Sequence, residues 1–414
     1  MMRSIEVVLA VVLVAVVFPA SAPAAEAQLK LTVKVAAAGG RNVPVCANID
    51  LPAQFKGNPE DVSATLRCAS GGEGLPGQIL MAGKQAQLWW ILPEAKVGVT
   101  AWTATLSDAK YAGKDVFAFE DTPGKHMDLL FAGRCVNRYM YERDASTKDS
   151  AHATYKVYHH VFDPEGKDYI TKGPGGKYTH HRGVYIGWSR LTVNKTGYDT
   201  WHMSRGVIQA HQKFLQKSAG PVLARATALI HWLDGEGKTL LAEERQTLVF
   251  RQPSPAVMLM EFRTKLIAAG GEIYLNGDPE HAGMQYRPHN DVAVHGGAKA
   301  TQTVYEFPED GIKTGGQKLN KNKDLPWAAV SYALRGKRYS VQHMNHSTNP
   351  KGTIYSAYRP YGRFGAFFKK TIEADGSLSL RYRILVLASE MPTREEMAIR
   401  HAAFNNPPEA HVAK

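Results

Sequence analysis

Hydrophobic and polar residues alternate with a period of two over most of the chain, which is the pattern of half-buried β-strands. In residues 28–110 the alternation runs through short segments, such as Leu29 to Val35, separated by turns that contain glycine or proline. In residues 116–390 the segments are longer and richer in aromatic residues. Because strands follow one another without intervening helices, a doubly wound α/β fold is excluded. We predict an all-β protein, in which a small N-terminal β-sandwich over residues 28–110 precedes a large antiparallel β-sandwich over residues 116–390.

One segment has a helical signature, and it lies in the C-terminal residues 391–414. Thr393 is followed three residues later by Glu396, which is the spacing of a capping box at a helix N-terminus. Met397 and Ile399 follow among good helix formers. We therefore predict a short helix from Thr393 to Phe404 that packs on the sheets, followed by a polar tail.

Residues 1–27 have the composition of a secretory signal peptide. An apolar run over residues 7–18 follows Arg3, and alanines are frequent before Gln28. The run is too short to span a bilayer comfortably, and the small residues suit cleavage after Ala27. We predict that the protein is exported to the periplasm or the extracellular space, with no membrane span after signal removal.

Charge and cysteine content narrow the choice of partners. The chain has 50 Lys and Arg against 38 Asp and Glu, a formal net charge of +12. In an exported protein with dispersed basic residues we expect no nucleic-acid partner, and a carbohydrate or other small-molecule ligand is the more natural one. Cys46 and Cys68 are candidates for a disulfide in an oxidising compartment. Cys135 is then left over, and no C-x-x-C pair for zinc is present.

The stretch from Tyr178 to Trp188, Y-T-H-H-R-G-V-Y-I-G-W, is the strongest candidate for a site. The even-numbered residues from 184 to 188 are apolar and are expected to face a core. On the other parity, His181 and Tyr185 alternate with two glycines, which strands tolerate where another group approaches the backbone closely. We predict a site on this second face, with His180, His181 and Arg182 at its mouth.

Three further segments carry similar residues at the ends of strands. They contain D-T-W-H at residues 199–202, G-D-P-E-H-A-G at residues 277–283 before Arg287 and His289, and H-M-N-H-S-T-N-P at residues 343–350 before R-P-Y-G-R at residues 359–363. Such loops carry function when a rigid scaffold brings them together. We predict one common cleft formed by His181, Arg182, His202, Arg287 and His346, with Glu280 or His289 at its rim.

These motifs, in this order over about residues 120–390, resemble a bacterial domain family of unknown function that is often labelled "methane oxygenase PmoA". Family members usually carry D-H-P-H-H-R-G where this chain has Lys177 to Gly183 with K-Y-T-H-H-R-G, so the leading acid and first histidine are missing. The resemblance assigns the family's arginine to Arg287. It implies a secreted β-sandwich similar to domains found with sugar-metabolising oxidoreductases. The methane oxygenase label does not fit, because that enzyme's subunit is a polytopic membrane protein.

Two functions are consistent with these residues. In the first, the protein is a carbohydrate-active enzyme of the lyase, hydrolase or epimerase type, in which histidine transfers protons and arginine fixes a carboxylate or polarises an oxygen. Histidines with a carboxylate are alternatively ligands of a divalent metal. In the second, the domain binds glycan without catalysis on an aromatic platform. The candidate catalytic residues are His180, His181, Arg182, His202, Arg287 and His346. The candidate binding residues are Tyr185, Trp188, Trp201, Glu280, His281, His289, Asn349, Arg359 and Tyr361.

Overall fold

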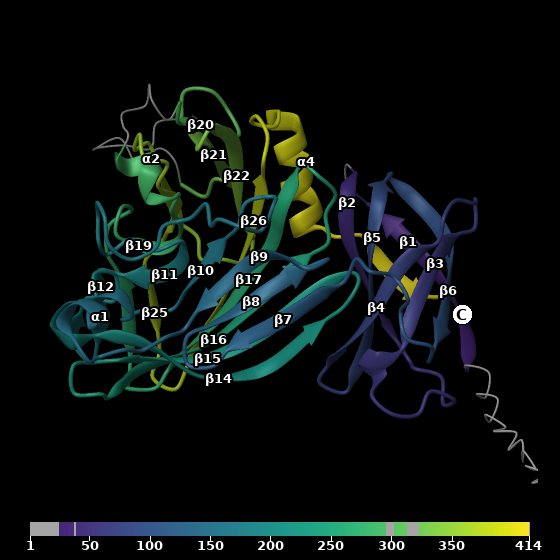
Figure 1. The fold of residues 1–414 in the computed structure, drawn as a ribbon, viewed down its shortest axis with the longest axis horizontal. Helices are drawn as coiled ribbons and strands as arrows, with labels where there is room; N and C mark the ends of the chain where they lie inside the picture. The colour runs from purple at the N-terminus through teal and green to yellow at the C-terminus, as the bar shows by residue number, and fades with distance from the viewer. Residues whose placement is uncertain (1–24, 37–38, 295–301, 313–322, 414) are drawn as a thin grey trace, which may run out of the picture.

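The computed structural model describes residues 25–36, 39–294, 302–312 and 323–413, so the predicted signal segment lies almost entirely outside the described residues. Strands dominate this part of the chain, and the helices in it are short. The all-β prediction is confirmed. Figure 1 shows a small unit of N-terminal strands beside a larger layered unit, with one C-terminal helix at the junction between them.

The N-terminal unit is a closed barrel, in which the order of neighbours is β1-β27-β2-β5-β4-β3-β6 and β6 returns to β1. Its strands are β1 (Glu26–Val35), β2 (Gly40–Ile49), β3 (Ser63–Cys68), β4 (Leu75–Ala82), β5 (Gln85–Ala95), β6 (Gly98–Ser107) and β27 (Glu409–Val412). The polar tail expected after the helix therefore includes a strand, β27, which closes the barrel by pairing with β1 and β2. Only Ala410 of this strand is buried, and the alternation of Ala410 and Val412 with polar residues spans just four positions, too few to predict a strand. Cys46, Cys68 and Cys135 are all free thiols, and the disulfide considered for the first two is not formed.

The larger unit is a sandwich of two eight-stranded antiparallel sheets. The first, here called the site sheet, has the order β23-β24-β19-β11-β10-β9-β8-β7, and the second, the back sheet, has the order β14-β15-β16-β17-β26-β22-β21-β20. The strands of the site sheet are β7 (Phe117–Thr122), β8 (His126–Phe131), β9 (Arg134–Met140), β10 (Tyr158–Val161), β11 (Val184–Trp188), β19 (Ala282–Tyr286), β23 (Ile354–Ala357) and β24 (Phe364–Phe367). The strands of the back sheet are β14 (Ile208–Ala219), β15 (Leu223–Leu233), β16 (Thr239–Phe250), β17 (Ala256–Ala268), β20 (Val304–Glu306), β21 (Trp327–Leu334), β22 (Lys337–Asn345) and β26 (Ser377–Leu387). One continuous hydrophobic core lies between the sheets.

Several smaller elements accompany the barrel and the two main sheets. A third sheet of four strands comprises β12 (Arg190–Val193), β13 (Thr196–Tyr198), β18 (Ile273–Asn276) and β25 (Lys370–Ile372). Short helical segments are α1 (Lys148–Ala153), α2 (Asn290–Val294), η1 (Pro59–Asp61) and η2 (Ser204–Gly206). Helix α4 (Arg394–Asn405) begins with the predicted capping box of Thr393 and Glu396, and it buries Met397 and Phe404.

Polar contacts fix the barrel to the sandwich. The carboxylate of Glu60 pairs with Arg225 of β15 at 3.0 Å and also accepts a hydrogen bond from Ser218 at 2.6 Å. Gln78 of β4 accepts hydrogen bonds from the backbone N–H groups of Val222 and Leu223 at 3.1 and 2.9 Å. Because these groups are largely buried, the contacts orient the two units as well as attach them.

Strand β11 has the two faces that its sequence predicts. Val184, Ile186 and Trp188 point into the core between the sheets. On the outer face, a Cβ atom at Gly187 would lie 2.4 Å from the carbonyl oxygen of Thr200. The backbone of residues 199–201 thus packs directly on β11, and Thr200 N–H donates to the carbonyl of Trp188 at 2.9 Å. The glycine is required because this second segment approaches the strand so closely.

Candidate metal centre

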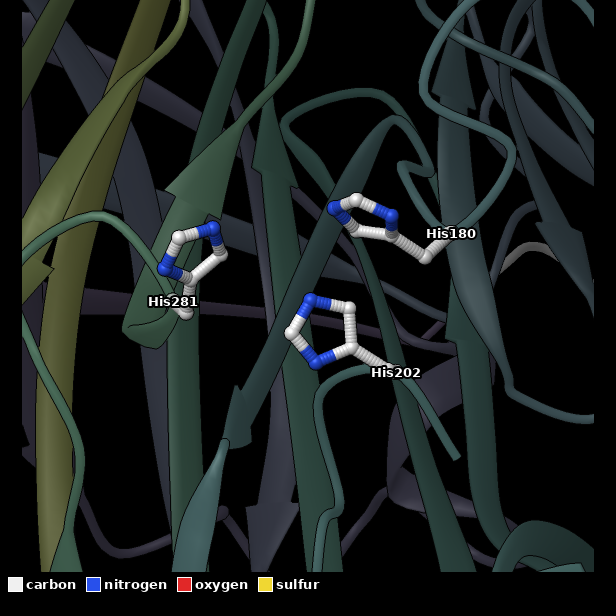
Figure 2. Close-up of side chains that lie close together, drawn as sticks. All are labelled: His180, His202 and His281. Atoms are coloured by element: carbon white, nitrogen blue, oxygen red, sulfur yellow. The ribbon is translucent and has the colours of Figure 1, made fainter. Parts of the chain in front are cut away.

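Three histidines from three separate loops converge over the outer face of the site sheet. His180 lies in the turn before β11, His202 in the turn after β13, and His281 in the turn before β19. Each offers one ring nitrogen, and these three nitrogens all lie within 4.8 Å of one another. Figure 2 shows the three rings directed toward a common point. The side chains of His202 and His281 are 38% and 36% exposed, so the centre is open to solvent.

Two of the three rings are each oriented by a separate carboxylate, and Asp199 is the one that orients His202. Asp199 accepts hydrogen bonds from the backbone N–H groups of Trp201 and His202 through Oδ1, at 3.0 and 2.8 Å, and its Oδ2 lies 2.8 Å from Nδ1 of His202. Burial acts to raise the pKa of Asp199, but the hydrogen bonds from His202 outweigh it and hold the pKa below its ordinary value. An ionised carboxylate at Nδ1 fixes the proton on that nitrogen, and Nε2 is left with a free lone pair.

Asp278 repeats this arrangement in the loop before β19. Its Oδ1 accepts from the backbone N–H groups of Glu280 and His281 at 3.0 and 3.1 Å and lies 2.9 Å from Nδ1 of His281. The two loops share the spacing D-x-x-H, because a carboxylate three residues before a histidine can cap the turn and orient the ring together. Carboxylate-oriented histidines of this kind are typical of metal ligands.

His180 is the third candidate ligand, and its ring has the protonation state and the unused nitrogen that metal binding requires. Its Nε2 atom is buried and has no hydrogen-bond partner among the described residues. Burial, followed by the nearby His202 and Lys156, lowers the pKa of His180 to about 2, so the ring is neutral at physiological pH. A neutral imidazole with an unused ring nitrogen is a ready ligand for a transition-metal ion.

Lys156 connects the loop that carries His180 to the loop that carries His202. Its Nζ donates to the carbonyl oxygen of His180 at 3.1 Å and also to the carbonyl oxygen of Trp201, the residue before His202. The ammonium lies 4.5 Å from the ring centroid of Tyr185. Burial lowers the pKa of Lys156 well below its ordinary value. This lysine was not among the residues predicted from the sequence, because nothing in the local pattern marks it.

An aromatic group borders the centre on the side of His181. The ring of Tyr178 lies 5.1 Å from that of His181 and 4.8 Å from that of Tyr361, between centroids. Tyr178 has a φ of 56°, in the left-handed region that a bulky residue rarely adopts. Such strain persists where the surrounding structure requires one orientation of a side chain. His181 itself is buried and its ring contacts that of His180 at 4.4 Å.

The predicted arginines and the glutamate have different surroundings. Arg182 donates to four backbone carbonyls in the loop and in α1, so its role is to hold the histidine loop in place. Glu280 accepts two hydrogen bonds from Arg359 and lies 3.4 Å from Arg363. Arg287 is buried and has no acidic partner among the described residues. Arg359 thus pairs with a carboxylate and Arg182 with four carbonyls, whereas Arg287 keeps two N–H-bearing nitrogens, Nε and Nη2, without a partner among the described residues.

Several predicted site residues lie elsewhere. His346 lies under α4 on the back sheet, where its Nε2 is 3.1 Å from Arg381 and its ring is 5.0 Å from Phe404. Asn349 bonds the side chain of Asn345 and the backbone of Arg381 in the same region. The prediction that His346 shares the cleft is therefore wrong, because the end of β22 belongs to the opposite sheet. His289 lies beside α2, with Asp291 at 3.2 Å.

The predicted aromatic platform is not a surface. Trp188 lies in the core between the sheets, and Tyr185 and Trp201 are covered on the outer face of the site sheet. Trp201 supports the centre from beneath, since its ring meets that of His281 edge-on at 6.3 Å. None of these three side chains is accessible for stacking on a sugar ring.

The sequence contained a signal for the centre beyond the paired histidines. D-x-x-H occurs at residues 149–152, 199–202 and 278–281, and the last two copies each supply a ligand together with the carboxylate that orients it. A search for this repeated spacing would have grouped His281 with His202 and added Asp199 and Asp278, but it would also have returned His152, which does not belong to the converging group.

Comparison with known proteins identifies a family for this chain but assigns it no activity. No curated protein matches the chain. Among the described residues, no helix has the length and apolar character needed to cross a membrane. The sequence match to a described family extends over residues 126–402, which include the three histidine loops and every strand of the site sheet except β7. By this match the chain belongs to the family of unknown function DUF6807.

Proposed function

We propose that this protein is a metal-dependent, carbohydrate-active enzyme whose centre is formed by His180, His202 and His281. The observation that carries the proposal is the convergence of three ring nitrogens within 4.8 Å, two of them on rings oriented by carboxylates. Three histidine imidazoles are a ligand set of catalytic zinc and related divalent ions, and they leave a coordination position for water or a substrate oxygen. The ion would act as a Lewis acid on a sugar oxygen or on water.

The protein's own groups supply orientation around that ion. Asp199 and Asp278 keep the Nδ1 protons in place, and Lys156 ties the first two ligand loops together. Tyr178 and Tyr361 present aromatic rings beside the centre, the kind of group against which a sugar ring packs. Catalysis by a lyase, hydrolase or epimerase mechanism is consistent with this arrangement.

Two other roles for the centre are less well supported. A structural zinc site is normally closed by four protein ligands, whereas the described part of the chain offers three here, two of which are more than a third exposed. A glycan-binding role without catalysis would need an accessible platform, and Trp188, Trp201 and Tyr185 are buried. Export, which rests on the N-terminal apolar run, is part of the same proposal.

The test begins with metal analysis of the purified chain and of two variants. We expect one divalent transition-metal ion per chain in the wild type, its loss in His202→Ala, and its retention in His411→Ala, which removes an exposed histidine of the barrel. Activity on a panel of sugars and glycosides should disappear on chelation and return with zinc, cobalt or manganese. Metal content that is the same in His202→Ala as in the wild type would refute the centre. Full activity after complete metal removal would refute its catalytic role.

A further inference from the structure

Arg287 presents a buried guanidinium edge with no acceptor. The residue is 2% exposed, and its Nη1 donates to Oε1 of Gln285 at 2.8 Å and to the carbonyl of Tyr286 at 3.3 Å. Nε and Nη2 have no hydrogen-bond partner among the described residues. A buried charge without a counter-charge is costly, so such a group normally has a partner or receives one from a ligand.

Other unpartnered donors lie around this edge. The guanidinium of Arg287 is 5.4 Å from the ring centroid of Trp201, and the ring of Trp201 is 4.8 Å from that of Tyr185. The indole N–H of Trp201 and the hydroxyl of Tyr185 are buried and, among the described residues, have no partner either. The group therefore offers several N–H and O–H donors, and its one acceptor is the hydroxyl oxygen of Tyr185. Its natural complement is a ligand group that only accepts hydrogen bonds.

This donor group adjoins the metal centre. Trp201 directly precedes His202, and its ring contacts that of His281. The backbone of Tyr185 pairs with that of Gln285 across β11 and β19, which places Tyr185 and Arg287 on the same outer face of the site sheet. A ligand that reached both the histidines and Arg287 would therefore occupy one continuous site.

The local charge balance is positive. Lys156 lies beneath the ring of Tyr185, and Arg363 is close enough that its charge, after burial, helps to lower the pKa of Arg287 to about 9. The carboxylates near this site are already engaged: Glu280 by Arg359 and Arg363, Asp199 by His202, and Asp278 by His281. Three histidine ligands would bring no negative charge of their own to offset that of a divalent ion. An anionic ligand is the one that this field favours.

We propose that the substrate of the metal centre is a sugar acid whose carboxylate binds the Nε–Nη2 edge of Arg287 through two parallel hydrogen bonds. A planar carboxylate matches that edge with both oxygens, whereas a sugar hydroxyl offers one oxygen and brings a donor of its own. Tyr185 and Trp201 supply the remaining donors, and the rings of Tyr178 and Tyr361 are suited to the sugar ring. This inference rests on the proposed function, because it assigns the substrate class of the same site.

The experiment compares D-glucuronate with D-glucose on the full chain, by calorimetry and thermal shift, with zinc present and after chelation. We expect glucuronate to bind and glucose to bind far more weakly. Arg287→Gln should weaken glucuronate binding by about 10- to 100-fold, the effect of losing a charge-assisted pair, without changing metal content. Arg287→Lys should recover part of the lost affinity, because lysine keeps the positive charge. The recovery should be incomplete, because lysine lacks the two parallel N–H donors of the guanidinium edge. Arg251→Gln, at a partly exposed arginine paired with Asp115, should bind as the wild type.

The outcomes separate this inference from the proposed function. The chain could prefer glucuronate to glucose in a way that depends on Arg287 and yet take up no metal. That result would refute the metal centre and leave the sugar-acid site in place. Normal metal uptake with equal binding of glucuronate by wild type and Arg287→Gln would overturn the inference, as would sulfate that competes as well as glucuronate. If Arg287→Gln does not fold, Tyr185→Phe takes its place. It removes one unpartnered hydroxyl, and it should weaken glucuronate binding about 2- to 10-fold. An unchanged affinity in that variant would overturn the inference.

Discussion

Replacing Asp199 with asparagine removes one specific hydrogen bond while leaving two others possible. In the native protein Oδ1 of Asp199 caps the backbone N–H groups of Trp201 and His202, and Oδ2 accepts from Nδ1 of His202. In Asp199→Asn the amide oxygen can keep the two backbone bonds, but the amide NH₂ then faces Nδ1. Because that NH₂ is a donor, it favours the His202 tautomer that carries its proton on Nε2. A protonated Nε2 has no lone pair with which to bind a metal.

Asp278 provides the matched control, because its hydrogen bonds are distributed differently. All three of them, from the backbone N–H groups of Glu280 and His281 and from Nδ1 of His281, go to the same oxygen, Oδ1. An amide oxygen in that position retains all three bonds, and only the charge is lost. Asp278 is also more exposed than Asp199, at 45% against 24%, so solvent screens its charge more strongly.

The expected magnitudes follow from this difference. Loss of a group that orients a metal-bound histidine typically weakens metal binding about 10- to 100-fold, or about 1.4 to 2.7 kcal/mol. Since His202 and Asp199 are partly exposed, we expect the lower part of this range for Asp199→Asn, about tenfold. For Asp278→Asn we expect at most about a threefold loss, consistent with a screened surface charge.

The assay is competition for zinc between the protein and a chromogenic chelator, with thermal unfolding in the presence of chelator to compare the metal-free folds. Both variants should unfold close to the wild-type temperature without metal, because the backbone caps remain. Equal losses of affinity in the two variants would refute the tautomer argument. An unchanged affinity in Asp199→Asn would show that the carboxylate does not orient a ligand at all.

Three further predictions concern other parts of the molecule. Gly187→Ala should displace residues 199–201, because its Cβ would lie 2.4 Å from the carbonyl oxygen of Thr200. The substitution should therefore lower both the metal affinity and the unfolding temperature. Gly197→Ala is the control, since its Cβ would have no atom within 4 Å, and it should leave the metal affinity unchanged. Burial lowers the pKa of His343 to about 3 from an ordinary 6.5, so the unfolded chain takes up a proton that the folded chain excludes, and stability should fall as pH drops from 6.5 toward 3. His343→Gln should flatten that dependence by up to about 1.4 kcal/mol per pH unit in urea titrations, and an unaltered slope would contradict the assignment. N-terminal sequencing of exported protein should begin near Gln28, and a cytoplasmic product that retains Met1 would exclude export.

The alternation of hydrophobic and polar residues determined the class of fold and the two faces of β11. Val184, Ile186 and Trp188 enter the core as their parity predicts, and the glycine at 187 marks a close backbone approach. The capping box at Thr393 likewise predicts the start of α4. These features are local, because side-chain direction alternates along a strand and a helix cap needs only residues within one turn.

Tertiary structure decided which loops meet. His346 and His281 both lie in turns next to strands, yet His281 joins the centre and His346 packs under α4 on the other sheet. Lys156 and β27 acquire their roles only through partners far along the chain, His180 and Trp201 for the lysine and β1 and β2 for the strand. A local pattern records the face on which a residue lies. Which distant segment covers that face depends on the order of strands in the sheets, and that order is set by pairing across the whole chain.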